Sequence, residues 1–204
     1  MERRLGLPAD RHVDARDTWW PGRPRRRSVR GSQGYSLIEL LIAFSCLAII
    51  AAMSVPGLSA ALDSSRTHGA ARYLAARMMV ARAYATSHGT TAALRFETVE
   101  GRVTVGVFAD GNRNGVRTID IAAGVDHTVT PPVAFEDLFP GVTLTLSEEA
   151  SALFSFTSVG TASTGTVEVH GPRGARFAVR VAGVTARTRI LRYVATSDMW
   201  SDAW

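Results

Sequence analysis

The sequence predicts an α+β protein in which a long N-terminal helix packs on an antiparallel, β-rich C-terminal head. Three observations support this fold class. Residues 35–58 form a nearly uninterrupted apolar run, and residues 59–88 carry apolar side chains at helical spacing. From residue 89 onward, apolar side chains alternate with polar ones, as they do in half-buried strands.

Residues 1–34 differ in composition from the rest of the chain and are expected to be a leader that is removed. Residues 1–33 hold nine arginines and four acidic residues, which accounts for the whole formal net charge of +5. Because positive charge next to a single apolar span stays in the cytoplasm, the cluster from Arg25 to Arg30 predicts a cytoplasmic N-terminus and an exported head. If translation instead begins at Val29, the leader is six residues long.

The apolar run 35–58 has the length of a membrane-spanning helix but contains one acidic side chain. A helix of about 20 mostly apolar residues crosses the hydrocarbon core of a bilayer. Glu39 lies near the start of the run and is its only charged side chain. An unpaired carboxylate in such a helix costs roughly 2.5 to 3.5 kcal/mol on insertion scales. Glu39 is therefore expected to have a cationic partner.

The apolar run begins with the hexapeptide Gly34-Tyr35-Ser36-Leu37-Ile38-Glu39. This hexapeptide resembles the cleavage and methylation signal of type IV prepilins and pseudopilins. The resemblance implies that a prepilin peptidase cuts after Gly34, methylates the new N-terminal residue Tyr35 and leaves Glu39 as the fifth mature residue. Tyr35 stands where the family usually has Phe, whereas Pro56 matches a proline that pilins commonly carry. The alternative is an ordinary signal anchor, although a secretory apolar region is usually only about 7 to 15 residues long.

A processed N-terminus would supply the partner that Glu39 needs. The free α-amino group of Tyr35 is cationic, so Tyr35 of one subunit can neutralise Glu39 of a neighbour when their helices bundle with a small offset. Such a pair would set the register of a filament, and Pro56 would lie further along the same packed helix. The implied partners are the prepilin peptidase, other pilin or pseudopilin subunits and the inner membrane, with the head in the periplasm or outside the cell.

The amphipathic pattern of residues 59–88 predicts that the helix continues beyond the apolar run. Apolar residues follow steps of three and four or their multiples, and the arginines mostly take other faces. The apolar series is Leu58, Leu62, Ala71, Leu74, Met78, Ala81 and Ala85. One helix from about Leu37 to Ser87 is therefore expected, bent near Pro56. It should end at His88-Gly89, because glycine suits a C-terminal cap.

A period of two from Thr90 onward predicts about six or seven short strands in residues 89–193, followed by a tail, residues 194–204. The alternating residues are Ala92, Leu94 and Phe96; Val103, Val105 and Val107; Val142, Leu144 and Leu146; Phe154 and Phe156; Val167 and Val169; Phe177, Val179 and Val181; and Thr188, Ile190 and Arg192. Turn residues, among them Pro131-Pro132, separate these runs.

The Ala-rich helix from Ala70 to Ala83, the segment from Val107 to Gly115 and the strand Phe154-Ser155-Phe156 resemble the GspH/FimT group. This group contains minor pseudopilins of type II secretion and minor pilins of type IV pili, so the resemblance implies a pilin-like fold. It also implies a structural subunit that initiates or caps a short filament. It leaves open whether the filament is a type II secretion pseudopilus or a type IV pilus, and whether the subunit lies at the tip.

Asp110, Asn112 and Asn114 are spaced like the first oxygen ligands of a calcium loop, with Gly115 at the sixth place. The twelfth place, where a bidentate acid belongs, is Ile121, and the flanking segments are predicted strands. We therefore expect no metal site but a hairpin loop, in which Asp and Asn side chains bond to their own backbone.

Six arginines lie in the closing strands, with no acidic residue between Glu168 and Asp198. They are Arg173, Arg176, Arg180, Arg187, Arg189 and Arg192. Some FimT-like minor pilins bind DNA through arginines in this region, so Arg187, Arg189 and Arg192 are candidate phosphate contacts of a tip subunit that takes up DNA or another ligand. We favour the alternatives, a solvated strand face or a surface that meets other minor subunits. Few aromatic side chains for base stacking accompany these arginines.

No catalytic site or cofactor is predicted. The four histidines after the leader show no metal-ligand spacing. The segment from Gly160 to Gly165 does not match a G-x-S-x-G nucleophile turn, because its serine is one place late. Cys46 is the one cysteine, so an intrachain disulfide is excluded. The sequence therefore predicts a structural or binding protein rather than an enzyme.

Overall fold

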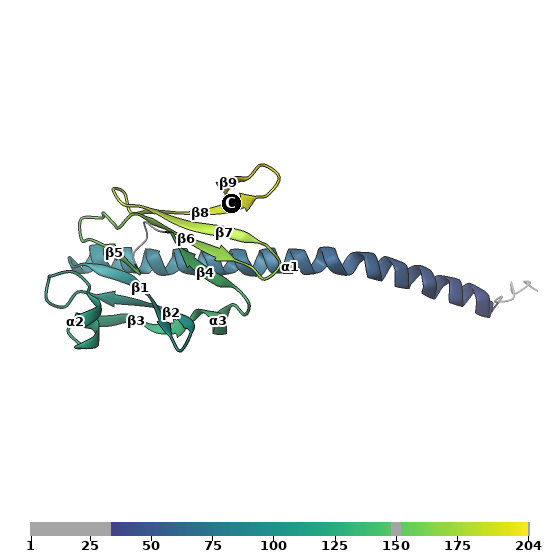
Figure 1. The fold of residues 1–204 in the computed structure, drawn as a ribbon, viewed down its shortest axis with the longest axis horizontal. Coiled ribbons are helices and arrows are strands. Elements are labelled where there is room, and N and C mark those ends of the chain that lie inside the picture. The colour runs from purple at the N-terminus through teal and green to yellow at the C-terminus, as the bar shows by residue number, and fades with distance from the viewer. Residues whose placement is uncertain (1–33, 148–151, 204) are drawn as a thin grey trace, which may run out of the picture. The chain divides into compact units, whose positions relative to one another are not determined.

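The computed structural model describes residues 34–147 and 152–203. The chain divides into two compact units, with the boundary between Phe44 and Ser45. Helix α1, Leu37–His88, runs from the first unit into the second, which holds the β-rich head (Figure 1). The predicted leader up to residue 33 lies outside the described residues.

Helix α1 has 52 residues and confirms the single helix predicted from the sequence. An 18-residue window within it has a mean hydropathy of 2.4 and is not buried, so the helix is long and apolar enough to cross a membrane. The helix continues through Pro56, and the bend expected there stays a prediction. The end at His88-Gly89 is confirmed, because Gly89 has a φ of 64° and lets the Thr90 N–H reach the Ala85 carbonyl at 3.2 Å.

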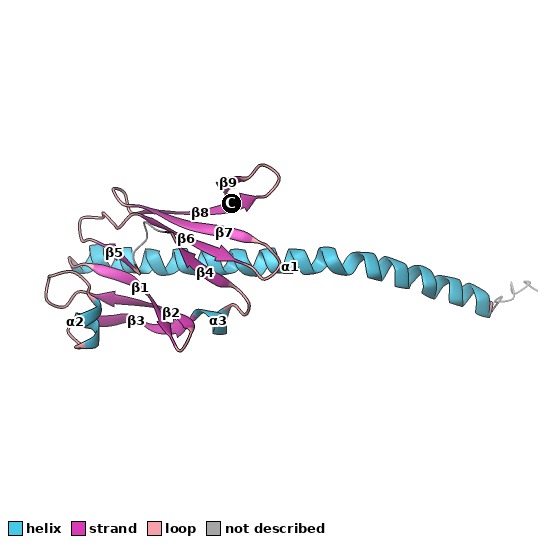
Figure 2. Ribbon diagram, in the orientation of Figure 1, coloured by secondary structure: helices cyan, strands magenta, loops and turns pink. Residues whose placement is uncertain are grey.

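The described part of the head contains nine strands and two short helices (Figure 2). They are β1 Ala92–Val99, β2 Arg102–Ala109, α2 Thr118–Ala122, β3 His127–Ala134, α3 Phe135–Leu138, β4 Thr143–Leu146, β5 Leu153–Phe156, β6 Gly165–His170, β7 Arg176–Ala182, β8 Arg187–Val194 and β9 Met199–Asp202. A four-stranded sheet has the order β3-β2-β1-β5, and a five-stranded sheet has the order β4-β6-β7-β8-β9. Within the described residues, all strand pairs in the two sheets are antiparallel.

One hydrophobic cluster joins the C-terminal part of α1 to both sheets. Leu74 and Met78 contribute from the helix, Phe154 from the four-stranded sheet and Val179 from the five-stranded sheet, and all four are essentially inaccessible to solvent. Burial of side chains of this size stabilises a fold by about 1.5 to 3 kcal/mol each. The α+β class and the period-two strands are therefore confirmed, because most of the alternating residues listed above belong to this cluster.

The prediction that Pro131-Pro132 forms a turn is wrong, because both prolines lie within strand β3. Strand β3 is at the edge of its sheet, where a missing N–H leaves no neighbour unpaired. The register slips by one residue here, so that the two prolines lie opposite Gly106 alone. A Cβ atom at position 106 would lie 3.1 Å from Pro132 Cγ, which explains the glycine at this bulge.

The predicted tail, residues 194–204, contains a strand that the sequence analysis missed. Strand β9 pairs with residues 191–194 of β8 and extends the five-stranded sheet. It is only four residues long and mostly exposed, so its sequence shows almost no alternation of burial. The short helices α2 and α3 were also missed, because a helix of five residues or fewer is too short to show a helical period.

Candidate functional site

The predicted processing residues and Glu39 lie at the start of α1, whereas Pro56 lies further along the same helix. Gly34 and Tyr35 precede the helix, and the Leu40 N–H bonds to the Ser36 carbonyl at 3.1 Å. Glu39 lies in the first turn, where the helix dipole favours a carboxylate. Glu39 is exposed and makes no ion pair within residues 34–147 and 152–203. A cationic partner for Glu39 is therefore not supplied by the part of its own chain that the structure describes.

All side chains from Gly34 to Ser54 are exposed. Large apolar examples are Leu41, Phe44 and Ile50, which are 56 to 62 % exposed. A contiguous apolar surface of this extent is unfavourable in water and marks a site that lipid or another protein covers.

A buried carboxylate, which the sequence analysis did not single out, attaches α1 to the turn between β6 and β7. Asp63 is only 6 % exposed. Its Oδ2 accepts hydrogen bonds from the backbone N–H groups of Arg173, at 3.1 Å, and Ala175, at 3.3 Å. The Arg173 guanidinium also donates to Ser59 Oγ at 2.6 Å. We call Asp63 together with residues 171–175 the hairpin clamp.

The hairpin clamp requires glycine at position 171. A Cβ atom there would lie 2.3 Å from Thr67 Oγ1 and 2.6 Å from Asp63 Oδ1. Thr67 Oγ1 donates to the Asp63 carbonyl at 2.7 Å, so this side chain is itself held in place. Asp63 and Thr67 are polar residues four apart on a helix face that is otherwise apolar, and this spacing is the sequence signal that could have revealed the clamp.

The loop after β2 is organised by Asp110, which is 6 % exposed. Its carboxylate accepts three backbone N–H groups at 2.7 to 3.1 Å, those of Asn112, Arg113 and Gly115. The Asn112 side-chain oxygen accepts the Asn114 N–H at 3.3 Å, and the Asn114 amide donates to Asp120 at 3.0 Å. These bonds confirm that Asp and Asn bond to their own backbone in this loop. The strand expected directly after the loop is wrong, because helix α2 follows it.

A second buried carboxylate, Asp126, closes the same loop from the other side. It accepts the backbone N–H groups of Gly111, at 3.1 Å, and Arg117, at 2.9 Å. The carboxylate oxygens that a calcium ion would use are thus already bonded to backbone donors. Within the described residues, no group of three His, Cys, Asp or Glu side chains is arranged to hold a metal ion.

The three candidate DNA-binding arginines do not share one face of β8. The register between β7 and β8 is regular, with Arg189 opposite Arg180 and Arg192 opposite the core residue Phe177. Because side chains alternate along a strand, Arg187 and Arg189 project from the outer face of the sheet, while Arg192 lies on the side of the helix. The three arginines therefore do not form one strand face, and DNA contact by them stays a prediction. Arg180 shares the outer face with Arg187 and Arg189 instead.

Arg176, on the same outer face, is engaged within the chain. Its guanidinium lies 4.5 Å from the centre of the Tyr193 ring and 5.7 Å from that of Trp200, and it bonds to Glu168 at 3.1 Å. Tyr193 and Trp200 meet edge to face at 5.4 Å and so tie β9 to β8. The Tyr193 hydroxyl donates to the Asp198 carboxylate, and this hydrogen bond raises the pKa of Tyr193.

On the helix side of the sheet, His68 stacks on Phe177 with ring centroids 5.0 Å apart. Burial lowers the pKa of His68 below its ordinary value, and the positive charges of Arg72 and Arg192 lower it further. A neutral His68 therefore stabilises the head above the unfolded pKa of 6.5, and this contribution is lost as the pH falls through the lowered folded pKa.

Comparison with known proteins gives two family matches. Residues 29–55 match the prokaryotic N-terminal methylation motif, and residues 70–185, more than half of the chain, match the type II transport protein GspH. Among solved structures, the chain is similar to the minor pseudopilin EpsH from the Type 2 Secretion System of Vibrio cholerae. The two share 14 % sequence identity with a TM-score of 0.46, over 62 % of this chain and 97 % of EpsH. No curated protein matches the chain.

Proposed function

Because the chain belongs to the type II transport protein GspH family, we propose that it is a minor pseudopilin or pilin that initiates or caps a short filament. The family consists of structural subunits, so the chain is a structural subunit rather than an enzyme. The N-terminal methylation motif and the apolar helix indicate anchoring in the inner membrane. The observation that carries the proposal is Glu39, a carboxylate without an ion pair in the described chain, at the start of an exposed helix of membrane length.

The proposed assembly proceeds from the chemistry of the first mature residues. The prepilin peptidase cuts after Gly34 and methylates Tyr35, whose cationic amine then neutralises Glu39 of a neighbouring subunit inside the helix bundle. The arginines around Arg25 to Arg30 keep the leader in the cytoplasm until cleavage, so that the head is exported. The exposed apolar helix surface passes from lipid into contact with other helices, including the segment around Pro56.

Replacing Glu39 with alanine tests this proposal. The variant should insert and be cut after Gly34, but its incorporation into filaments should fall about tenfold or more, since loss of one partner of a buried ion pair costs roughly 3 to 5 kcal/mol. The measurement is the intact mass and the amount of processed chain in the filament fraction. Cys46→Ala, an uncharged change on the same exposed helix, should assemble like the wild type. Equal incorporation of Glu39→Ala, or a chain not cut at Gly34, contradicts the proposal.

DNA binding at the filament tip is a second candidate function. It is favoured by the outer face of β7 and β8, where Arg180, Arg187 and Arg189 lie together. If these arginines contact phosphates, replacing Arg187 and Arg189 with alanine should weaken duplex DNA binding by the detergent-solubilised protein. The slope of the logarithm of the DNA-binding constant against the logarithm of the salt concentration should also become shallower, by about one unit per lost phosphate contact. Arg192→Ala, on the opposite face, is the matched control. Equal losses in both variants, or no binding at low salt, would count against this function.

A further inference from the structure

Strand β9 covers only part of the edge of β8. It pairs with residues 191–194, and the Ala203 N–H then bonds to the Ile190 carbonyl at 3.0 Å. Within the described residues, no strand pairs with residues 187–189 on this side. Since the Ile190 carbonyl points to this edge, alternation along the strand directs the backbone N–H and carbonyl of Thr188 to it as well. The start of β8 therefore presents a free strand edge.

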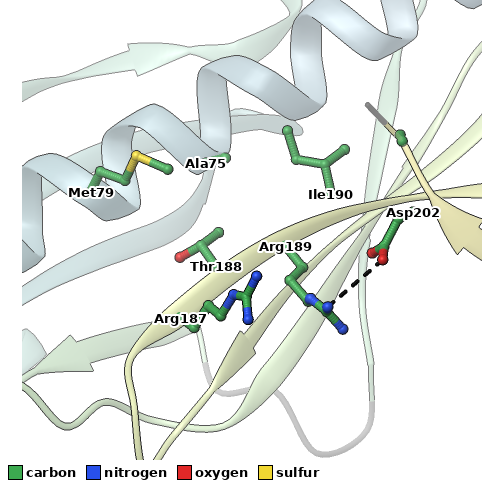
Figure 3. A pocket seen from close by; sticks show the side chains of 8 residues that line it. Ala75, Met79, Arg187, Thr188, Arg189, Ile190 and Asp202 are labelled. Carbon is green, nitrogen blue, oxygen red and sulfur yellow. Dashed lines mark ion pairs between the residues drawn. The ribbon is translucent and has the colours of Figure 1, made fainter.

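A pocket of about 210 Å³ lies beside this free edge, between β8 and helix α1 (Figure 3). Its lining residues are Ala75 and Met79 of the helix, Arg187, Thr188, Arg189 and Ile190 of β8, and Asp202 and Ala203. Met79 is 58 % exposed, so an apolar wall of the pocket is open to solvent. The volume is sufficient for an apolar side chain.

The rim of the pocket carries excess positive charge. Arg187 makes no ion pair within the residues that the structure describes, and Arg189 reaches Asp202 only at 3.7 Å (Figure 3). Outside the pocket lining, Arg82 of the helix donates to the Ala186 carbonyl at 3.5 Å, one residue before Arg187. Two guanidinium groups and one carboxylate therefore line the pocket, which favours an acidic ligand.

We propose that this free edge and pocket bind an extended segment of a neighbouring filament subunit. The unpaired backbone groups of Thr188 suit a strand added to the sheet edge. The pocket would take an apolar side chain of that segment, and Arg187 or Arg189 would bind a carboxylate next to it. The inference rests on the proposed assembly into a filament, and it adds the surface and the chemistry of the partner.

Site-specific photocrosslinking in the full-length protein tests the docking surface. A benzophenone amino acid replaces Met79, and the filament fraction is irradiated and analysed by peptide mass spectrometry. The expected product joins residue 79 to another subunit of the filament, at an extended segment with Asp or Glu within two residues of an apolar side chain. The matched control carries the same photoreactive residue at Val184, which is 88 % exposed and outside the pocket, and should not capture that segment.

Charge reversal at Arg187 then tests the proposed ion pair between this arginine and a carboxylate of the bound segment. Arg187→Glu should lower the crosslink yield roughly fivefold, and a compensating acid-to-arginine change in the captured segment should restore it. Arg113→Glu makes the same change of charge at an exposed position that does not line the pocket. It should leave the crosslink yield unchanged.

Several outcomes overturn the inference. A crosslink from residue 79 only to Trp204 of the same chain would mean that the chain covers its own edge. A crosslink to DNA, capture of a segment without an acid, or an unchanged yield in Arg187→Glu would exclude the proposed partner chemistry. A chain that enters filaments in a Glu39-dependent way but gives no crosslink overturns this inference alone. A chain that never enters filaments overturns the proposed function.

Discussion

Replacing Asp63 with alanine should lower the free energy of unfolding of the head by about 2 to 4 kcal/mol. The change leaves the partly buried N–H groups of Arg173 and Ala175 without an acceptor. A donor left unsatisfied costs about 1 to 3 kcal/mol when it is buried. Relief of the desolvation of the carboxylate, whose Oδ1 has no partner in the described residues, offsets part of this loss. Urea unfolding of the detergent-solubilised protein, followed by circular dichroism, measures the effect. Asp63→Asn keeps an acceptor oxygen, so it should lower the free energy of unfolding less than Asp63→Ala does.

The glycine of the hairpin clamp offers a second, independent change at the same contact. Gly171→Ala should destabilise the head by a similar amount, because the added Cβ atom would displace the turn from Thr67 and Asp63. In the double variant Gly171→Ala, Asp63→Ala, the free energy of unfolding should fall by clearly less than the sum of the two single decreases, since both changes disrupt one contact. Gly69→Ala is the matched control, because its Cβ atom would meet only Phe139 at 3.8 Å and alanine favours a helix. Additive losses, or a stable Gly171→Ala protein, contradict the role of the clamp.

Replacing Asp110 with alanine should cost about 3 kcal/mol and unfold the loop after β2. Three backbone N–H groups lose their acceptor together, and Arg113, which has a φ of 66°, loses the hydrogen bond that holds this conformation. Thermal unfolding and amide hydrogen exchange of residues 111–117 measure the effect. Asn114→Ala, an exposed change in the same loop, should cost less than about 1 kcal/mol.

Calcium separates the two interpretations of this loop. If Asp110 serves its own backbone, millimolar calcium should leave the melting temperature unchanged in both the wild type and Asp110→Ala. A rise in melting temperature that calcium causes in the wild type alone would show that the loop binds the ion, because a ligand that binds only the folded state stabilises it.

Features that depend on near neighbours in the chain were predictable. The apolar run and Glu39 are read directly from consecutive residues, and the end of α1 follows from Gly89. The Asp110 loop was predicted because its acceptor and donors lie within five residues of each other. Period-two alternation identified the core strands for the same reason, since neighbouring side chains of a strand face opposite ways.

Features that depend on distant segments were missed or wrongly predicted. Pro131-Pro132 was placed in a turn because only the sheet order shows that β3 is an edge strand. Arg192 was grouped with Arg187 and Arg189, whereas the regular pairing of β7 with β8 places it on the helix side. Strand β9 is held by contacts of Trp200 with Tyr193 and Arg176, which no local pattern in the tail indicates.

The sequence by itself determined the helix, the core positions, the family resemblance and the residues proposed for processing. Only the tertiary structure decided which side chains share a face of a sheet. It also decided which distant polar groups form hydrogen bonds and which strand edge is left without a partner strand. Asp63 and Arg173 are 110 residues apart, and their hydrogen bond exists only because the hairpin packs on the helix. The physical reason is that periodicity and capping are local interactions, whereas strand register, burial and pocket shape follow from packing that the whole head creates together.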